Sequence, residues 1–444
     1  MLNGIWLGLM LASVVYAAFV GRMDAVKMAA ISGARDAVDL VIGLVGVMAL
    51  FLGLMRVAQE GGLLRAVQRG LAPILRRLFP DVPIEHPAMG AMIMNLASNV
   101  LGLGNAATPF GLKAMTELQT LNRTPASASD AMVLFLAINA TSVSLFPLGV
   151  IGVRASMNSA SPEAIWIPTL LATTASTGTA ILLCFALRRL PMFRPRSDPE
   201  TPLAVGSPAA SSEAEVQQTR GPDGDHASPA ERRSVTRTAK LVIFATTGLL
   251  AIALIRHLIV NAPTTTPLTL ARDTFGAWFL PIFMIGLLLV GLAGRVRVYE
   301  VAIEGAREAL EVAVRIVPFL VLILVAIAML RASGALDALV SAVDPVTGRL
   351  GFPAEALPMA LLRPLSGSGA YGVMVDIMKT HGPDSFIGIL AGALNGSTET
   401  TFYVLTLYLG AARVRDGRHA LLACLGGDIA GFAVATAACH WLFG

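Results

Sequence analysis

A single carboxylate among hydroxyl and amide side chains is the strongest chemical signal in the sequence. Asn395, Ser397, Thr398 and Glu399 lie in a stretch, 385–412, that contains no other charged residue. A carboxylate within so long an apolar stretch is costly unless it is protonated, paired or hydrated. We therefore expect Glu399 to face a polar cavity, where it hydrogen-bonds a substrate or carries a coupling proton. A carboxylate with a purely structural role is the alternative.

A second copy of this polar patch lies 256 residues earlier in the chain. It contains Asn139, Thr141, Ser142 and Ser144, and Val143 stands where the other copy has its acid. Hydroxyl side chains in apolar helices often bond only the carbonyl four residues back. Because the two patches align with one another, we expect Asn139, Thr141 and Ser142 to line the same substrate site.

The stretch 87–121 combines amide side chains with glycines and a proline in an apolar context. Such breaks predict a re-entrant hairpin, whose freed backbone groups are satisfied by polar side chains. Unwound carbonyls and amide oxygens suit Na⁺, and half-helix N-termini favour anionic groups. We expect Asn105 and Thr108 to bind substrate and Asn95 and Asn99 to bind a coupling ion. Hydrogen bonding between helices is the competing interpretation.

The stretch 355–380 contains a comparable break, with Arg363 before Ser366 and Ser368. We expect these three residues to contribute to the substrate site. The arginine has three open roles: it pairs with the acid of the polar patch, holds an anionic substrate, or extends to the membrane interface. Asp428 is a further acid deep in the last apolar segment, and we expect it to bind a coupling ion, with a structural carboxylate as the alternative.

Other kinds of chemistry find little support in the sequence. It contains neither a GxxxxGK[ST] nor a GxGxxG phosphate loop, and its six histidines are isolated. Cys184, Cys424 and Cys439 lie in apolar segments without metal-ligand spacing. We therefore expect no catalytic residues, no metal site, no cofactor and no enzymatic activity.

Composition places the chain in a bilayer. Its 444 residues are 55% apolar and 14% charged, whereas soluble proteins carry about 25% charged residues. Uncharged runs long enough to cross the hydrocarbon recur at 1–21, 131–153, 164–187 and 274–294. The 33 basic residues are scattered between these runs, so the expected partners are the lipid bilayer and a small-molecule solute, and not nucleic acid. The sequence leaves a homo-oligomer open.

Two halves of the chain match in order, which predicts a duplication. Residues 33–37 correspond to 305–309, and Arg77 corresponds to Arg349, both at an offset of 272. An additional apolar segment at 241–260 has no counterpart in the first half, so the second half is expected to enter the membrane from the opposite face. The predicted fold is an all-α polytopic membrane protein of two inverted-topology repeats with re-entrant hairpins and broken helices.

The distribution of arginines agrees with inversion. The amphipathic segment 61–79 carries four arginines and no acid, whereas its counterpart at 335–350 carries two acids and one arginine. Positive charge favours the cytoplasmic side, so we expect the first segment inside and the second outside. The predicted divisions are a first repeat at 1–190, a disordered cytoplasmic linker at 191–237, an additional transmembrane helix and loop at 238–273, and a second repeat at 274–444.

At these same segments the chain resembles a fusion of the bacterial spore maturation proteins A and B, a family built on a "gate" or nucleoside-recognition domain. The first part carries His86-Pro87-Ala88-Met89-Gly90 and Gly104-Asn105-Ala106-Ala107-Thr108-Pro109. The second part carries Arg363-Pro364-Leu365-Ser366-Gly367-Ser368-Gly369 and Gly396-Ser397-Thr398-Glu399-Thr400-Thr401. The resemblance implies a multi-pass protein of the bacterial cytoplasmic (inner) membrane.

More distantly, the order of interfacial helix, hairpin and broken helix is similar to concentrative nucleoside transporters. That resemblance implies an inverted-repeat fold with substrate bound at the hairpin tips. The first hairpin tip of that family reads Gly-Gln-Thr-Glu-Ala-Pro, and the corresponding tip at 104–109 lacks its base-contacting acid. This difference argues against nucleosides as substrates.

The resulting hypothesis is a secondary transporter of a small polar solute that works by alternating access and is coupled to H⁺ or Na⁺. Paired polar breaks in two inverted halves are typical of transporter binding sites near the bilayer midplane. The alternative is a membrane scaffold or receptor of the same family that binds a ligand without transporting it.

Overall fold

The computed structural model describes residues 2–102, 107–194, 237–261 and 267–444, and every element longer than a single β-bridge in these ranges is helical. The all-α prediction is therefore confirmed. Most of the predicted linker, residues 195–236, lies outside the described residues. In chain order the longer helices are α1 Leu2–Val20, α2 Met23–Glu60, α3 Leu63–Leu78, α4 Pro87–Val100, α5 Thr108–Thr120, α6 Asp130–Thr141, α7 Leu148–Ser156, α8 Trp166–Leu187, α10 Arg237–Asn261, α11 Pro267–Ala293, α12 Val298–Ser333, α13 Ala335–Thr347, α14 Leu357–Leu362, α15 Gly367–His381, α16 Phe386–Ser397, α17 Thr401–Ala411 and α18 Ala420–Phe443.

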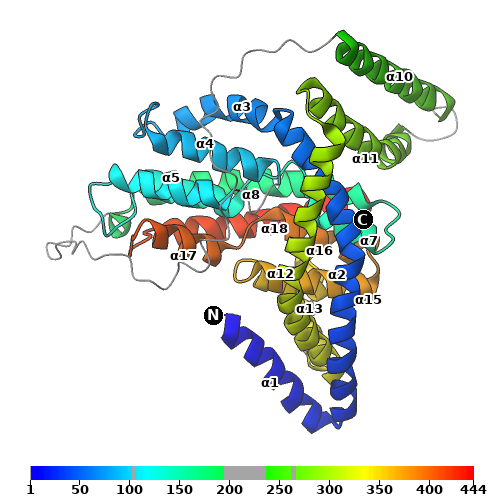
Figure 1. The fold of residues 1–444 in the computed structure, drawn as a ribbon. Helices are drawn as coiled ribbons and strands as arrows, with labels where there is room; N and C mark the ends of the chain where they lie inside the picture. Colours follow the sequence, from blue (N-terminus) through cyan, green and yellow to red (C-terminus); the bar gives the residue numbers. More distant parts are fainter. Residues whose placement is uncertain (1, 103–106, 195–236, 262–266) are drawn as a thin grey trace.

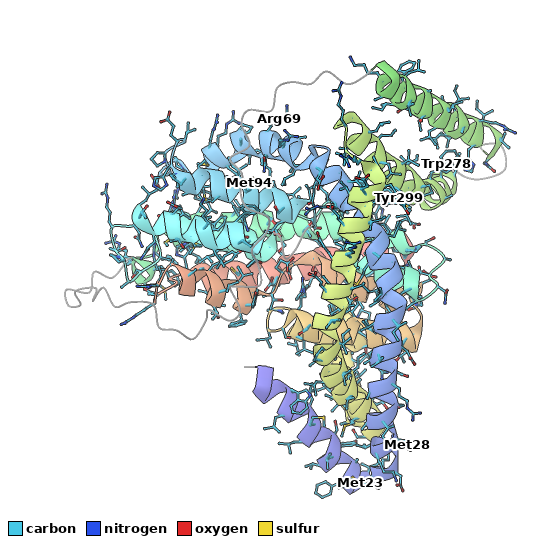
Figure 2. The ribbon with its side chains drawn as sticks, in the orientation of Figure 1. Met23, Met28, Arg69, Met94, Trp278 and Tyr299 are labelled. Atoms are coloured by element: carbon cyan, nitrogen blue, oxygen red, sulfur yellow. The ribbon has the colours of Figure 1, made fainter. Side chains whose placement is uncertain are left out.

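Several helices are long and apolar enough to cross a bilayer. Within the described ranges they are 23–60, 162–187, 239–261, 274–293 and 420–443, and α12 and α13 form a further candidate span bent by 77°. Large apolar side chains such as Met23 and Met28 point outward from α2 (Figure 2). The protein is thus a multi-pass membrane protein. Trp6–Val20, expected as a crossing, ranks among the shorter apolar helices.

Helix α2 is 38 residues long, because its sequence contains no proline and its ends are set by glycines. Gly21 has φ +73° just before it and Gly62 has φ +100° just after it. Left-handed backbone of this kind suits glycine and interrupts a helix. The helix therefore continues through the charged residues at its start.

Helices α2 and α12 pack against one another along most of their length (Figure 1). A Cβ on Gly33 would lie 3.2 Å from the Cβ of Ala328, and one on Gly305 would lie 2.6 Å from the Cβ of Arg56. These close approaches at opposite ends show that the two helices run antiparallel. The sequence offset of 272 makes α2 and α12 counterparts in the two halves. Counterpart helices of inverted repeats run in opposite directions, as α2 and α12 do. The membrane topology of the complete repeats stays a prediction.

Helices α6 and α16 begin and end at equivalent positions of the two halves. Ser129 accepts a hydrogen bond from the backbone N–H of Met132, and Ser385 accepts one from that of Gly388. Such serine caps satisfy backbone donors that a helix start leaves unpaired. Both helices stop at the polar patches, so each expected crossing there is a broken helix, continued by α7 or α17.

The predicted hairpins are also interrupted near the expected places. The first consists of α4 and α5, which pack against each other, and the second of α14 and α15, separated by residues 363–366. Pro87 and Pro109 occupy the first turns of α4 and α5, where a missing backbone N–H is tolerated. Helix α3, the amphipathic segment, lies along α4, and Arg69 projects from its outer side (Figure 2).

Two buried arginines connect the halves at opposite ends of the broken helices. Arg154, fully buried in the last turn of α7, donates to the carbonyl of Pro383 and to the carboxylate of Asp384 at 2.9 Å. Arg418, between α17 and α18, donates to the carbonyl of Ala128 at 3.1 Å and forms a salt bridge with Asp130. Each arginine thus holds the first turn of the broken helix that belongs to the other half.

Candidate functional site

The two broken helices meet at their breaks. The backbone N–H of Glu399, between α16 and α17, donates to the carbonyl of Ala140, at the end of α6, at 2.8 Å. The last turn of α16 contains Gly396, whose missing side chain allows the close approach of Thr169 from α8: a Cβ there would lie 2.7 Å from the Thr169 methyl. Helix α16 therefore ends where a backbone N–H of the second half is hydrogen-bonded to a carbonyl of the first half.

Each break is also bonded to the hairpin of its own half. The N–H of Leu145 donates to the carbonyl of Val100 at 2.8 Å, and that of Phe402 donates to the carbonyl of Pro364 at 3.0 Å. The carbonyls that accept these bonds lie at the end of α4 and between α14 and α15. The structure thus brings both hairpins and both broken helices to one place.

Arg363 provides the positive charge at this junction. Its side chain is 9% exposed, it donates to the backbone carbonyl of Thr398, and it lies 3.7 Å from the carboxylate of Glu399. Of the three roles open to this arginine, pairing with the acid is the one seen, and its burial is incompatible with extension to the interface. Glu399 itself is 53% exposed, so its carboxylate is paired with Arg363 and still accessible.

Three amides of the predicted site form hydrogen bonds among the helices. Asn99 donates to Asn139 at 3.0 Å, joining α4 to α6. Asn95 is fully buried and donates to the carbonyl of Ala107 at 2.8 Å and to the hydroxyl of Tyr408 at 3.3 Å. These bonds match the competing interpretation, helix-to-helix hydrogen bonding, although the Oδ1 of Asn95 lacks a partner among the described residues.

Some hydroxyl side chains of the predicted site form hydrogen bonds within their own helix, and one has no hydrogen-bond partner in the part of the chain that the structure describes. Thr141 and Ser397 bond carbonyls of the preceding turn, at 2.8 Å each, and Ser366 caps α15 through the N–H of Gly369. Thr398 is buried, and its Oγ1 has no partner within the described ranges. Local bonding therefore accounts for three of these hydroxyls and leaves Thr398 available.

The remaining predicted residues lie at or next to helix ends. Ser142 is buried just after α6, Asn395 lies in the last turn of α16, Ser368 is 3.4 Å from Ser366, and Thr108 begins α5. Asn105 lies outside the described residues.

Asp428 approaches the junction from α18. It is 1% exposed and accepts a hydrogen bond from the hydroxyl of Thr401 at 2.7 Å. Thr401 was not among the predicted site residues, although it belongs to the same polar run, and neither was Tyr408. The spacing of seven residues between Thr401 and Tyr408 places both on one face of α17, which was the available signal.

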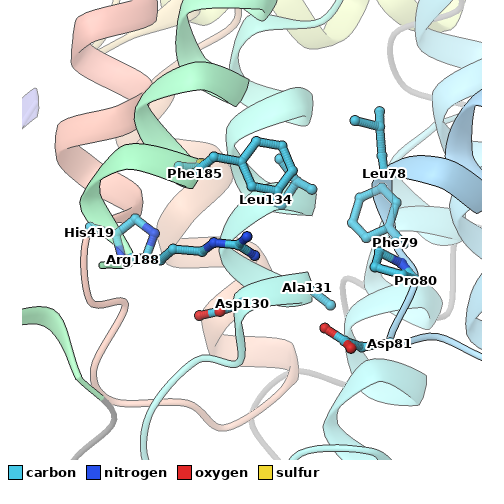
Figure 3. A pocket seen from close by; sticks show the side chains of 11 residues that line it. Leu78, Phe79, Pro80, Asp81, Asp130, Ala131, Leu134, Phe185, Arg188 and His419 are labelled. Carbon is cyan, nitrogen blue, oxygen red and sulfur yellow. The ribbon is translucent and has the colours of Figure 1, made fainter. Parts of the chain in front are cut away.

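A separate pocket lies at the far end of α6 from the break (Figure 3). Asp130, Arg188 and His419 face it together with apolar side chains of α3 and α8, and the guanidinium of Arg188 lies 4.7 Å from the ring centre of Phe185. Burial and the charge of Arg418 lower the pKa of His419. This pocket contains none of the predicted site residues.

Comparison with known proteins agrees with the duplicated architecture. A family model described as "Gate: Nucleoside recognition" matches residues 41–157 and 313–414. The first match runs from within α2 to the end of α7, and the second runs from within α12 to just beyond α17. No solved structure matches.

Two curated relatives each match part of the chain. Spore maturation protein A of Bacillus subtilis (strain 168) is 42% identical over 183 residues, which cover 41% of this chain and 93% of the relative. Spore maturation protein B of the same organism is 44% identical over 165 residues, which cover 37% of this chain and 93% of that relative. With nearly all of each relative represented in one polypeptide, the chain belongs to the spore maturation protein A and B family, with the gate domain present twice.

Proposed function

We propose that this protein is a secondary transporter that moves a small polar solute across the bacterial cytoplasmic membrane by alternating access. The observation that supports it is the backbone hydrogen bond between Glu399 and Ala140, which joins the two broken helices at their interruptions. Irregular backbone at membrane depth is tolerated where it lines a binding cavity. Two interrupted helices of opposite halves that meet with two hairpins are the arrangement of many transporter sites.

The charges at the junction define the class of solute. Glu399 is half-exposed, and Arg363 is buried beside it. A hydrogen-bond donor or a positively charged group of the solute would bind Glu399, while Arg363 orients the carboxylate. The site therefore suits a compact polar molecule better than an apolar one.

Energy for transport would come from an ion gradient, either H⁺ or Na⁺. The chain contains no phosphate-binding loop of the GxxxxGK[ST] type. Deep acids such as Glu399 and Asp428 are the usual carriers of coupling charge in membrane proteins.

The description of the matched family, nucleoside recognition, makes nucleosides one class to test. The hairpin tip at 104–109 has no acid to contact a base, so amino acids and small carboxylic acids belong in the same screen. The ranking among these classes is an outcome of the screen.

The test is solute flux in proteoliposomes containing the full chain, with Glu399→Gln as the variant. The substitution keeps size and hydrogen bonding but removes the charge beside Arg363, so we expect flux to fall at least about tenfold, as for loss of a buried charge partner. Glu308→Gln is the matched control, because Glu308 is 51% exposed on α12 and away from the junction.

Two results would contradict the proposal. Undiminished flux in the Glu399→Gln protein would remove this carboxylate from the mechanism. Saturable binding of a solute without flux in either direction would instead support the alternative, a membrane receptor or scaffold that recognises the same ligand.

A further inference from the structure

Several buried oxygens beside the junction have no hydrogen-bond partner within the described part of the chain, and three of them lie near α18. They are Oγ of Ser176 on α8, Oγ1 of Thr398 at the end of α16 and Oδ1 of Asp428 on α18. The exposed fractions of these residues are 0%, 3% and 1%. Buried polar atoms are nearly always paired, and each that is not requires an explanation.

These side chains lie together where α8 and α18 pack closely. A Cβ added to Gly431 would lie 3.3 Å from the Thr398 methyl and 3.4 Å from the Ser176 hydroxyl. Asp428 is one turn before Gly431 on α18, and Thr401 donates to its other carboxylate oxygen at 2.7 Å. Four oxygen-bearing side chains from three segments of the second half and one helix of the first half thus converge.

The charges nearby leave an excess of one negative charge. Arg363 interacts electrostatically with both Glu399 and Asp428. One guanidinium and two carboxylates give a net charge of −1 when all three groups are ionised. Of the two carboxylates, only that of Asp428 is buried. A buried charge without its own counter-charge is costly in a low-dielectric interior, and one bound monovalent cation would neutralise it.

We propose that Ser176, Thr398, Thr401 and Asp428 form a sodium-ion site beside the substrate junction. Hydroxyl and carboxylate oxygens are hard ligands, and Na⁺ binds such oxygens next to unwound helices in other transporters. A single cation would coordinate all three unpaired oxygens at once and would neutralise the carboxylate of Asp428. The role of this ion as the coupling ion rests on the proposed function, but its binding does not.

Thr398 connects the proposed sodium site to the substrate junction. Thr398 belongs to both sites: its carbonyl accepts a hydrogen bond from Arg363, and its side chain lies beside the carboxylate of Asp428. Sodium bound at the hydroxyl would fix the break of α16, and with it the orientation of Arg363 and Glu399. Sodium and solute are therefore expected to strengthen one another's binding.

The test is thermal unfolding of the full-length protein in detergent, in NaCl and in choline chloride of equal ionic strength. A ligand that binds only the folded state shifts the unfolding equilibrium by 1 + [L]/Kd, about elevenfold at ten times Kd. We expect a saturable rise of Tm in NaCl that is absent in choline chloride. Tryptophan fluorescence provides the signal, because the chain contains four tryptophans.

Variants separate a sodium site from a structural role. Asp428→Asn keeps an acceptor for Thr401 and removes the excess charge, so this variant is expected to fold without Na⁺ and to show no sodium response. Ser176→Ala, which removes one ligand, is expected to raise the apparent Kd for sodium at least tenfold and serves if the first variant does not fold. Glu308→Gln is the control and should respond like the wild type.

Three outcomes would overturn the site. The Tm is the same in NaCl and choline chloride; or the sodium response persists in Asp428→Asn; or the Tm follows pH alone, which would make Asp428 a proton carrier. A protein that responds to sodium as expected but transports no solute would retain the ion site and remove the proposed function, so the two failures are distinguishable.

Discussion

Arg154 and Asp384 belong to opposite halves of the chain and form a salt bridge of 2.9 Å, in which the arginine side chain is fully buried and the aspartate is 43% exposed. Arg154 also donates to the carbonyls of Ser161 at 3.0 Å and Pro162 at 3.1 Å. Because so many acceptors surround one guanidinium, the start of α16 is held to the end of α7. Alternating access would require this connection, or that of Arg418 with Asp130, to loosen as the halves move.

Asp384→Asn is expected to destabilise the protein by about 1 to 3 kcal/mol, the usual cost of weakening a hydrogen bond to a buried charged group. The guanidinium of Arg154 would lose its counter-charge while remaining buried. Thermal unfolding measures the change. Asp24→Asn is the control, because Asp24 is 97% exposed and pairs only with exposed Lys27 among the described residues; an equal loss of stability in both variants would contradict the prediction.

The same carboxylate is expected to limit stability in acid. Burial opposes its ionisation, but hydrogen bonds from Ser159 and the Ala160 backbone and the charge of Arg154 outweigh burial and lower the pKa of Asp384 below 3.8. A lowered folded-state pKa gives stability that is present above pH 3.8 and is lost as the pH falls through the lowered value. The difference in stability between the wild type and Asp384→Asn should therefore shrink as the pH falls from 5 to 2. A constant difference over this range would contradict the prediction.

His419 predicts a second pH dependence, closer to neutrality. Burial and the neighbouring Arg418 lower its pKa below the ordinary value of 6.5. The unfolded chain then binds a proton that the folded protein does not, so stability falls as the pH decreases through 6.5. His419→Gln should reduce the slope of Tm against pH between 7 and 5. An unchanged slope would assign the dependence to other groups.

Gly305→Ala is expected to destabilise the α2–α12 contact by about 1 to 3 kcal/mol, the usual cost of overpacking. The new methyl would lie 2.6 Å from the Cβ of Arg56 and 2.7 Å from the carbonyl of Leu52. Gly46→Ala on α2 is the matched control, since nothing lies within 4 Å of its added Cβ. If both variants kept the Tm of the wild type, the close contact between α2 and α12 would not contribute to stability.

Arg363→Gln is expected to lower solute flux about tenfold while leaving the protein folded, since Glu399 would lose its counter-charge but stay partly hydrated. Flux in proteoliposomes and the Tm are measured together. Loss of flux with an unchanged Tm supports a role at the substrate, whereas a large decrease in Tm would identify a purely structural arginine.

The sequence was sufficient for the helical class, the two interrupted hairpins and the end of α16 at the polar run, because glycine, proline and clustered hydroxyl residues act locally. It was not sufficient for long-range partners. Arg154 and Asp384 are 230 residues apart, and neither belongs to a motif. Ser176 was missed for a similar reason: its significance depends on the packing of α8 against α18, which composition does not reveal.

The glycine contacts between α2 and α12 have a consequence for how the halves must be made. The surface that each helix presents is shaped for the other, so two separate polypeptides carrying these halves would have to be produced in equal amounts and find one another in the membrane. Covalent linkage in a single chain fixes their stoichiometry at one to one and makes the search for a partner intramolecular.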